Sequence, residues 1–281
     1  MGEVRPLLAA VLGNPISHSK SPRMHNYWLK QRNINGYYIP IKVEVEDFER
    51  TIRSLMNMGF SGVNVTIPHK VSALKIADES SSIAKYIGAA NTLIFTNEKE
   101  IYADNTDAFG FLNNIRCKYP SWNPKKGTSV VLGAGGASRA VIAALLSEGS
   151  EKIIVLNRTI EKAEVLKRDY NNKITVEPWE HLNDIVVSSS NIINTTSLGM
   201  NGKTFIPVNP RFIPKEALVS DLVYTPIETN FLKMAKSRGS RTVDGLGMLI
   251  HQGIPGFEAW FDQTPLVLSL IHISEPTRQW Q

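Results

Sequence analysis

Residues 129–140, Ser-Val-Val-Leu-Gly-Ala-Gly-Gly-Ala-Ser-Arg-Ala, join a short apolar run to a run of small and apolar residues at helical spacing. The first run predicts a buried strand and residues 137–146 predict a helix, so the glycines fall where a strand turns sharply into a helix. A backbone without side chains can approach a pyrophosphate, which would rest on the helix N-terminus. Ser138 stands where this fingerprint usually has a third glycine or an alanine, and a tight turn without a ligand is the alternative.

The next predicted strand, over residues 152–156, ends in Asn157, Arg158 and Thr159 and has no acid there. In sites selective for NAD, a carboxylate at this position accepts a hydrogen bond from the ribose 2′-hydroxyl. A guanidinium between two neutral polar groups suits a 2′-phosphate instead. Together the two motifs predict a dinucleotide site that prefers NADP.

Composition and charge bound the class of protein. The chain has 281 residues, 42% of them hydrophobic, which is enough for two domains of ordinary size or one large α/β domain. Its 31 basic and 26 acidic residues give a net charge of +5, but the basic residues are scattered and form no stripe of the kind that binds nucleic acid. The lone Cys117 excludes an intramolecular disulfide and a cysteine-based zinc site, and we expect no metal. With no signal-like N-terminus and no apolar stretch of about 18 residues, we expect a soluble cytoplasmic protein without a membrane partner.

Strand and helix patterns alternate along the first part of the chain. Strands are expected over 7–12, 37–43, 62–67 and 90–95, and helices over 22–31, 47–58 and 108–116. The alternation over residues 7–67 favours a mostly parallel sheet with helices packed against it.

Residues 119–127, Tyr-Pro-Ser-Trp-Asn-Pro-Lys-Lys-Gly, interrupt this alternation, so we place a domain boundary after residue 117. Beyond it the glycine-rich turn opens a second alternating series. Strands are expected near Ile153, Ile174, Ile192 and Val219, and helices over 160–170 and 230–238. Such a series is typical of a doubly wound sheet, which binds ligands at the carboxyl ends of its strands.

Polar turns follow several strands of the first domain. Residues 13–22, Gly-Asn-Pro-Ile-Ser-His-Ser-Lys-Ser-Pro, bring several hydroxyl groups together before a helix. Such a turn can bind a carboxylate, although ordinary capping of the helix by Ser21 explains the same residues.

Two further turns carry charged groups. Residues 64–70, Asn-Val-Thr-Ile-Pro-His-Lys, end a strand and place Lys70 at the start of a helix. A lysine in a cleft loses solvation and can exchange protons near neutral pH, whereas most single lysines are solvated surface charges. Residues 104–107, Asp-Asn-Thr-Asp, supply a carboxylate partner, with helix capping as the alternative.

These motifs together make the chain resemble the shikimate dehydrogenase family of aromatic amino-acid biosynthesis. The resemblance rests on residues 13–22, 64–70, 88–92 (Gly-Ala-Ala-Asn-Thr), 104–107, 133–139, 157–159 and 244–249 (Asp-Gly-Leu-Gly-Met-Leu), which occur in the family's order. It implies a reversible NADPH-dependent reduction of 3-dehydroshikimate to shikimate.

The resemblance also implies an architecture and a catalytic pair. The chain would form an N-terminal α/β substrate domain, 1–117 completed by 246–281, and a doubly wound Rossmann-like NADP domain, 118–245, with a cleft between them. By motif position, Lys70 and Asp107 match the family's catalytic pair. Lys70 would stabilise the oxyanion and supply its proton, and Asp107 would orient the reacting groups.

The remaining site residues are assigned by the same resemblance, with shikimate and NADP as the small-molecule partners. Shikimate would be bound by Ser19, Ser21, Thr66, Lys70, Asn91, Asp107, Tyr224 and Gln252. The NADP pyrophosphate would be bound by Gly133, Ala134, Gly135, Gly136 and Ala137. The ribose phosphate would be bound by Asn157, Arg158, Thr159 and Lys162, and the nicotinamide end would be lined by Leu222 and Gly245.

Three questions stay open at this point. Residues 269–281 depart from the family's C-terminal helix, and because Pro276 interrupts any helix there, we interpret this end as frameshifted or otherwise non-native. A quinate/shikimate dehydrogenase that uses NAD and a non-catalytic regulatory module that binds shikimate and NADP are the alternative functions. The oligomeric state is open, with a homodimer as one candidate.

Overall fold

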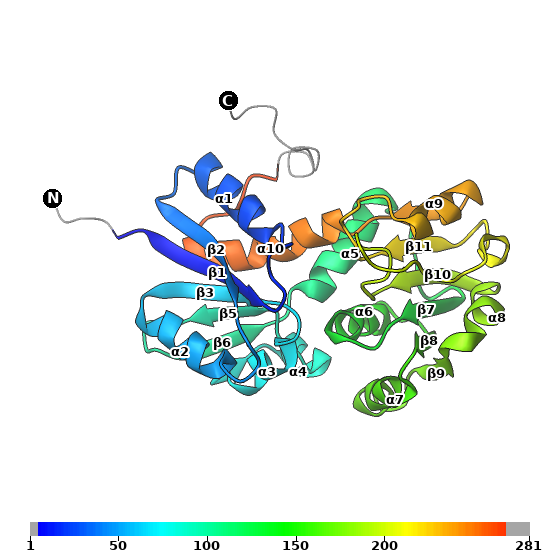
Figure 1. Cartoon of the computed structure of the whole chain (residues 1–281), viewed down its shortest axis with the longest axis horizontal. Helices are drawn as coiled ribbons and strands as arrows, with labels where there is room; N and C mark the ends of the chain where they lie inside the picture. The colour runs from blue at the N-terminus through cyan, green and yellow to red at the C-terminus, as the bar shows by residue number, and fades with distance from the viewer. Residues whose placement is uncertain (1–4, 268–281) are drawn as a thin grey trace. The chain divides into compact units, whose positions relative to one another are not determined.

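The computed structural model describes residues 5–267 (Figure 1). Its chain divides into two compact units, one running up to Thr106 and again from Gln252, the other covering Asp107–His251. The bounds expected from the sequence, 1–117 with 246–281 and 118–245, differ from this division in where residues 107–117 and 246–251 are assigned, and they remain a prediction. The expectation for residues 269–281 lies outside the described residues.

The first unit is built around a six-stranded sheet. Its elements are β1 (Leu7–Gly13), α1 (Ser21–Gln31), β2 (Gly36–Lys42), α2 (Phe48–Asn57), β3 (Phe60–Val65), α3 (Lys70–Lys75), β4 (Glu79–Ser80), α4 (Ser82–Ile87), β5 (Thr92–Phe95) and β6 (Ile101–Asp104).

The strand order of this sheet is β2-β1-β3-β5-β6-β4. The β1–β2, β1–β3 and β4–β6 pairs are parallel, but β5 runs antiparallel to both β3 and β6. The mostly parallel sheet predicted from the first three strands is confirmed, and the antiparallel course of β5 was not predicted. The turn of residues 96–100, where Thr96 N donates to Glu100 O at 3.0 Å, makes β6 antiparallel to β5, because a connection this short cannot join parallel strands.

The core of the first unit forms where α2 packs on the sheet. The helix buries Phe48, Ile52 and Leu55, which lie on one face at spacings of four and three residues. They belong to the same cluster as Leu12 of β1 and Val63 of β3, both fully buried. Burial of these side chains fixes which faces of the strands point inward.

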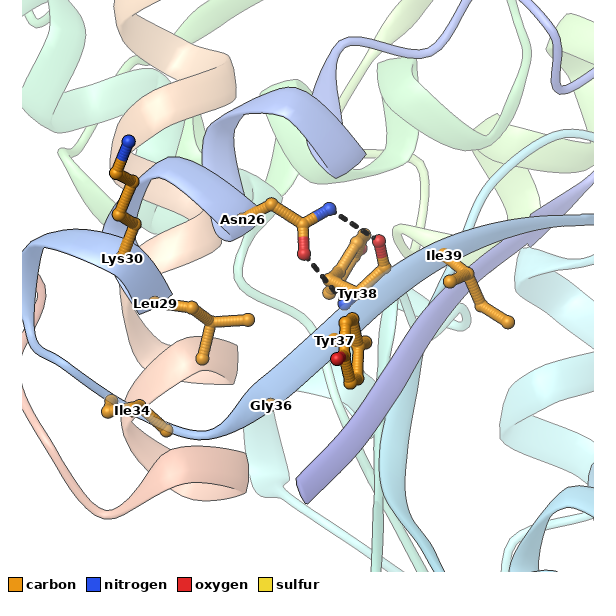
Figure 2. A pocket seen from close by; sticks show the side chains of 8 residues that line it. All are labelled: Asn26, Leu29, Lys30, Ile34, Gly36, Tyr37, Tyr38 and Ile39. Atoms are coloured by element: carbon orange, nitrogen blue, oxygen red, sulfur yellow. Dashed lines mark hydrogen bonds between the residues drawn. The ribbon is translucent and has the colours of Figure 1, made fainter. Parts of the chain in front are cut away.

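An edge strand, β2, has part of its exposed backbone satisfied by α1. Asn26 Oδ1 accepts a hydrogen bond from Tyr38 N at 3.0 Å, and Asn26 Nδ2 donates to Tyr38 O at 2.7 Å (Figure 2). A pocket beside this contact is lined by Leu29, Lys30 and Ile34 among others, and by none of the residues predicted to bind shikimate. We therefore assign this pocket no part in the chemistry.

The second unit also contains a six-stranded sheet. Its elements are α5 (Asp107–Lys118), β7 (Thr128–Leu132), α6 (Gly136–Ser147), β8 (Lys152–Asn157), α7 (Ile160–Asp169), β9 (Thr175–Pro178), η1 (Trp179–His181), α8 (Leu182–Val186), β10 (Ser189–Asn194), η2 (Pro210–Phe212), β11 (Leu218–Asp221), α9 (Asn230–Ser237), β12 (Arg241–Val243) and the start of α10 (Leu246–Phe261), which ends in the first unit.

The sheet of the second unit is entirely parallel, in the order β12-β11-β10-β7-β8-β9. The chain starts in the centre at β7, extends to β9 on one side, and then crosses to β10 on the other. This is the doubly wound topology predicted from the sequence. The point where the direction reverses lies between β7 and β10, so a ligand is expected beside the turn that follows β7.

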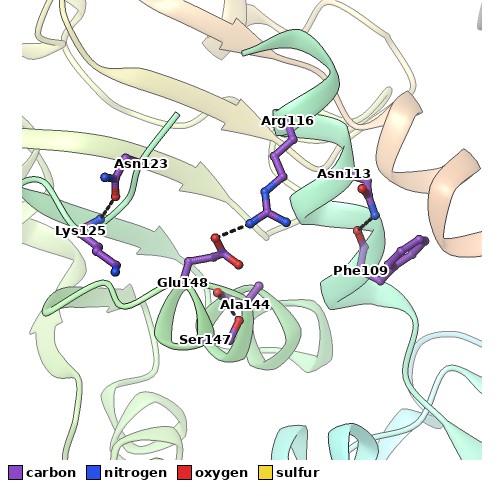
Figure 3. A network of polar contacts seen from close by, with 8 residues as sticks. All are labelled: Phe109, Asn113, Arg116, Asn123, Lys125, Ala144, Ser147 and Glu148. Atoms are coloured by element: carbon purple, nitrogen blue, oxygen red, sulfur yellow. Dashed lines mark hydrogen bonds and ion pairs between the residues drawn. The ribbon is translucent and has the colours of Figure 1, made fainter. Parts of the chain in front are cut away.

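Helix α5 packs against α6 within the second unit. Arg116 of α5 forms an ion pair with Glu148, the residue that follows α6 (Figure 3). Both side chains are partly exposed, so this pair contributes little to stability by itself. Of the helices in the described part of the chain, none is long and apolar enough to cross a membrane.

Candidate functional site

Polar residues of the first unit collect at the carboxyl ends of strands β1 and β3. The turn of residues 14–20 leaves the carboxyl end of β1, and Thr66 and Lys70 follow the carboxyl end of β3. The two ends are tied together, because Thr66 N donates to Leu12 O and Asn14 N donates to Ile67 O, each at 2.9 Å. Because β5 runs antiparallel to β3, the start of β5 lies beside the carboxyl end of β3. Asn91, the residue before β5, therefore lies with this group.

Asn91 is the centre of a buried hydrogen-bond network at this edge. Its side chain is 2% exposed, and Nδ2 donates to Thr106 Oγ1 and to Gln252 Oε1, both at 3.0 Å. Its Oδ1 accepts from Thr106 N at 2.9 Å and from Thr92 Oγ1 at 3.0 Å. These partners fix the amide, and they bring the predicted residues Asn91 and Gln252 together although 161 positions separate them.

The hydroxyl turn before α1 is ordered by its own contacts. Ser21 N donates to Ser19 Oγ at 3.3 Å, and Ser21 is 6% exposed. The alternative in which Ser21 caps the helix is wrong, because α1 begins at Ser21 and Lys20 occupies the N-cap position. The turn therefore offers two serines at a helix start without using Ser21 as a cap.

The predicted catalytic residues both begin helices. Lys70 is the first residue of α3, as predicted, and Lys70 O accepts a hydrogen bond from Ala90 N at 2.8 Å, directly before Asn91. Asp107 is the first residue of α5 and follows Thr106, which is bonded to Asn91. The Asp107 side chain is only 5% exposed, and it belongs to the second unit whereas Lys70 belongs to the first. That their side chains meet remains a prediction.

In the glycine-rich turn of the second unit, one glycine is favoured by its backbone conformation and another leaves the backbone open. Gly133 has φ +108°, and a Cβ there would lie 2.8 Å from Thr196 Cγ2, so any other residue would be strained at this position. At Gly135, in contrast, an added Cβ would meet no heavy atom within 4 Å, which leaves the backbone accessible at the N-terminus of α6. Ser138 is buried and donates its hydroxyl to Gly135 O at 2.6 Å, so this departure from the fingerprint braces the turn.

The turn after β8 presents the predicted 2′-phosphate ligands. Asn157 ends β8, and its Nδ2 donates to Thr159 O at 2.7 Å, which holds the turn closed. Arg158, Thr159 and Lys162 are exposed around the start of α7. A guanidinium and an ammonium near a helix N-terminus suit a dianionic phosphate.

The predicted nicotinamide-end residues lie close together in the second unit. Leu222 N donates to Asn194 O at 3.0 Å, and Gly245 N donates to Val223 O at 3.3 Å. A Cβ on Gly245 would collide with the Leu222 carbonyl, so glycine allows this close approach. Tyr224, predicted to lie near the shikimate carboxylate, is half-buried in the same segment.

Several buried polar residues at these sites were assigned no role from the sequence, although Asn64 and Thr106 stand in the motifs of residues 64–70 and 104–107. Thr106 and Asn64 support Asn91, and Asn64 Oδ1 in turn accepts from the Tyr38 hydroxyl at 2.6 Å. Asn194 and Asp221 end two adjacent strands of the second sheet and are fully buried. For Asn194 and Asp221, the signal in the sequence was a polar residue that ends an otherwise apolar strand. Among the residues the structure describes, no group of three or more His, Cys, Asp or Glu could hold a metal ion.

Comparison with known families matches both units. Residues 11–93 match the shikimate dehydrogenase substrate binding domain, and residues 119–201 match shikimate / quinate 5-dehydrogenase. The two matches fall in the same order along the chain as the two units.

Individual relatives cover nearly the whole chain. A shikimate dehydrogenase (NADP(+)) of Roseobacter denitrificans is 48% identical over 258 residues, covering 92% of this chain and 93% of that protein. The crystal structure of shikimate 5-dehydrogenase from Thermus thermophilus, in complex with NADP(H) and shikimate, has a TM-score of 0.83 at 34% identity and covers 95% of this chain and 97% of its own. Quinate dehydrogenase from Corynebacterium glutamicum in complex with NAD has a TM-score of 0.85 at 28% identity, over 96% and 97% of the two chains.

Proposed function

This chain belongs to the shikimate dehydrogenase family, and on that premise we propose that it interconverts 3-dehydroshikimate and shikimate with NADP through the pair Lys70 and Asp107. It is an NADP-dependent oxidoreductase of aromatic amino-acid biosynthesis. The observation that carries the assignment is the near full-length similarity to NADP-dependent relatives. The assignment of the pair rests on motif position and on the placement of each residue at the start of a helix that leaves the end of a strand.

In the reductive direction, bound NADPH supplies the hydride that the ketone carbon of 3-dehydroshikimate accepts. The chain's own residues must then stabilise the negative charge that develops on the ketone oxygen. Lys70 Nζ, as an ammonium, does this and donates the proton that turns the oxygen into a hydroxyl. Asp107 accepts a hydrogen bond from the reacting or adjacent hydroxyl and holds the substrate in line with Lys70.

Substrate recognition rests on polar groups, because a small triol acid offers almost no apolar surface. We assign the substrate carboxylate to Ser19 and Ser21, with Tyr224 nearby, and the ring hydroxyls to Thr66, Asn91 and Gln252. The Asn91 amide already uses both donors and both lone pairs within the protein, so a ring hydroxyl would have to replace one of these partners, and the assignment of Asn91 rests on its motif position. A ligand without the matching hydroxyl would leave a buried polar group unpaired, which strongly disfavours its binding.

The residues of the second unit fit NADP. The open backbone at Gly135 and the start of α6 would hold the pyrophosphate, and Arg158 with Lys162 would hold the 2′-phosphate. Leu222 and Gly245 would line the nicotinamide end. The alternative of an NAD-dependent quinate/shikimate dehydrogenase is less favoured, because no acid stands at residues 157–159 to accept from a ribose 2′-hydroxyl. The presence of both Lys70 and Asp107 disfavours the non-catalytic module.

The test of the catalytic pair is a comparison of Lys70→Ala, Asp107→Asn and Lys75→Ala. Lys75 is an exposed lysine on the same helix as Lys70 and serves as the matched control. We expect kcat of the Lys70 and Asp107 variants to fall by about a hundredfold or more, as general acid–base groups require. Shikimate binding, followed by calorimetry, should persist in Lys70→Ala. Wild-type turnover in that variant would remove Lys70 from the mechanism.

Two further parts of the proposal concern the cell and the assembly. A cytoplasmic location follows from a role in amino-acid biosynthesis, and a homodimer is one candidate for the assembly.

A further inference from the structure

Asp221 is a buried carboxylate that the proposed mechanism does not use. It ends β11, and its exposed fraction is 0%. Three donors point at it: Asn194 Nδ2 at 2.8 Å and Val223 N at 3.0 Å to Oδ1, and Thr229 Oγ1 at 2.7 Å to Oδ2. All three partners are uncharged, so the carboxylate is held by hydrogen bonds and not by an ion pair.

Asn194 extends this contact to the neighbouring loop. It ends β10, and its Oδ1 accepts from Thr196 N at 3.0 Å and from Thr196 Oγ1 at 2.7 Å. Between them, Thr195 Oγ1 donates to Leu132 O at 2.7 Å, directly before the Gly133 turn. Side chains therefore join the loops that follow β7, β10 and β11. The strand order reverses between β7 and β10, so these contacts lie beside that point.

The hydrogen bonds of Asp221 do more than stabilise the core, because they join it to a loop and to a helix start. Burial raises the pKa of its carboxyl to about 6, and the hydrogen bonds from Thr229, Val223 and Asn194 only partly oppose that rise. Because a buried carboxylate loses its hydration, part of the stabilisation from its hydrogen bonds only offsets that cost. The carboxylate also orients its neighbours. One oxygen accepts from the loop backbone at Val223, and the other accepts from Thr229, the N-cap residue of α9, so the loop and the helix start are held relative to each other.

We propose that Asp221 is a positioning residue that holds the segment 222–226 in place at the nicotinamide end of the NADP site. The inference rests on the proposed function, which assigns Leu222 of this segment to the nicotinamide end and Tyr224 to the substrate carboxylate. It makes no claim on the adenosine end, whose predicted ligands follow β8.

The test compares two ligands on the intact enzyme. NADP reaches both ends of the site, whereas adenosine 2′,5′-bisphosphate carries the ribose phosphate but no nicotinamide. Dissociation constants for both are measured by calorimetry on wild type, Asp221→Ala, Asp221→Asn and Val219→Ala. Val219 is fully buried in the same strand and in the hydrophobic core of the unit, so its truncation controls for destabilisation alone.

We expect Asp221→Ala to raise the dissociation constant of NADP by about tenfold, in line with the loss of hydrogen bonds to a charged group. The dissociation constant of the bisphosphate should change by less than about twofold. Asp221→Asn keeps an oxygen for Val223 N and Asn194 Nδ2, so its effect on NADP should be smaller and in the same direction. Val219→Ala should leave both dissociation constants unchanged. If Asp221→Ala does not fold, the Asn variant decides by the same comparison.

Equal weakening of both ligands, no weakening of NADP, or an equal effect from Val219→Ala would each overturn the inference. A wild-type enzyme that binds the bisphosphate and NADP, with Asp221 variants that behave like it, would overturn this inference and leave the proposed function standing. A wild-type enzyme that binds neither ligand would overturn both.

Discussion

We propose that the choice between NADP and NAD depends on residues that follow β8. Arg158 is exposed in the turn that Asn157 holds closed, and its guanidinium is available to a 2′-phosphate. We predict that Arg158→Ala raises the KM for NADP by about tenfold or more and leaves the KM for NAD nearly unchanged, because only NADP carries the phosphate. Arg168→Ala, an exposed arginine in the last turn of α7, is the matched control. An equal change in both KM values would contradict the selectivity argument.

Two glycines of the turn after β7 should respond oppositely to the same substitution. Gly133→Ala should destabilise the fold by at least about 1 kcal/mol, since φ is +108° and the methyl would press on Thr196. Gly135→Ala should fold normally, because φ is −100° and the methyl meets no protein atom within 4 Å, yet it should weaken NADP binding by occupying the path of the pyrophosphate. Thermal melting and calorimetry separate the two effects. Wild-type NADP affinity in Gly135→Ala would place the pyrophosphate elsewhere.

Packing between elements of the first unit buries a titratable group. His25 of α1 is fully buried, stacks on Tyr38 of β2 with ring centroids 4.0 Å apart, and lies 5.9 Å from the ring of Trp260 in α10. Neither of its ring nitrogens has a hydrogen-bond partner among the described residues. Burial lowers the pKa of His25 from 6.5 to about 3, so the imidazole is neutral in the folded protein.

This burial makes the stability of the protein sensitive to acid. As pH falls below 6.5 the unfolded chain takes up a proton at this position and the folded chain does not, so stability is lost between about pH 6.5 and pH 3. At pH 5 the loss from this group is about 2 kcal/mol. Urea titrations at about pH 7.5 and pH 5 should show a smaller acid loss in His25→Phe than in wild type. Identical acid losses in His25→Phe and wild type would refute the assignment.

Secondary structure was predictable where periodicity was strong. The helix at the glycine-rich turn was expected over 137–146 and spans Gly136–Ser147, and the helix after β8 was expected over 160–170 and spans Ile160–Asp169. The antiparallel course of β5 and the short elements β4 and α4 were not foreseen. The reason is physical, since two to six residues carry too little periodicity and the direction of a strand depends on tertiary pairing.

At the scale of the whole molecule, the two sheets were better predicted from the sequence than the side-chain networks that join the loops within each unit. The turns that carry Ser19, Lys70 and Asn91 were recognisable because hydroxyl, amide and charged residues follow apolar strands. The supporting contacts of Thr106, Asn194 and Asp221 were not, because they join residues far apart in the chain and depend on strand order. Motifs thus located the groups proposed to touch ligands, and only the fold revealed the residues that hold them.

The most direct test of the account is a set of initial rates for shikimate and for quinate, each with NADP and with NAD, followed by the absorbance of the reduced nicotinamide. We predict that shikimate with NADP is the fastest pair and exceeds shikimate with NAD by about tenfold or more, since the turn proposed to bind the 2′-phosphate carries Arg158 and has no acid at residues 157–159. Faster turnover with NAD, or no reduction in any of the four mixtures, would contradict it.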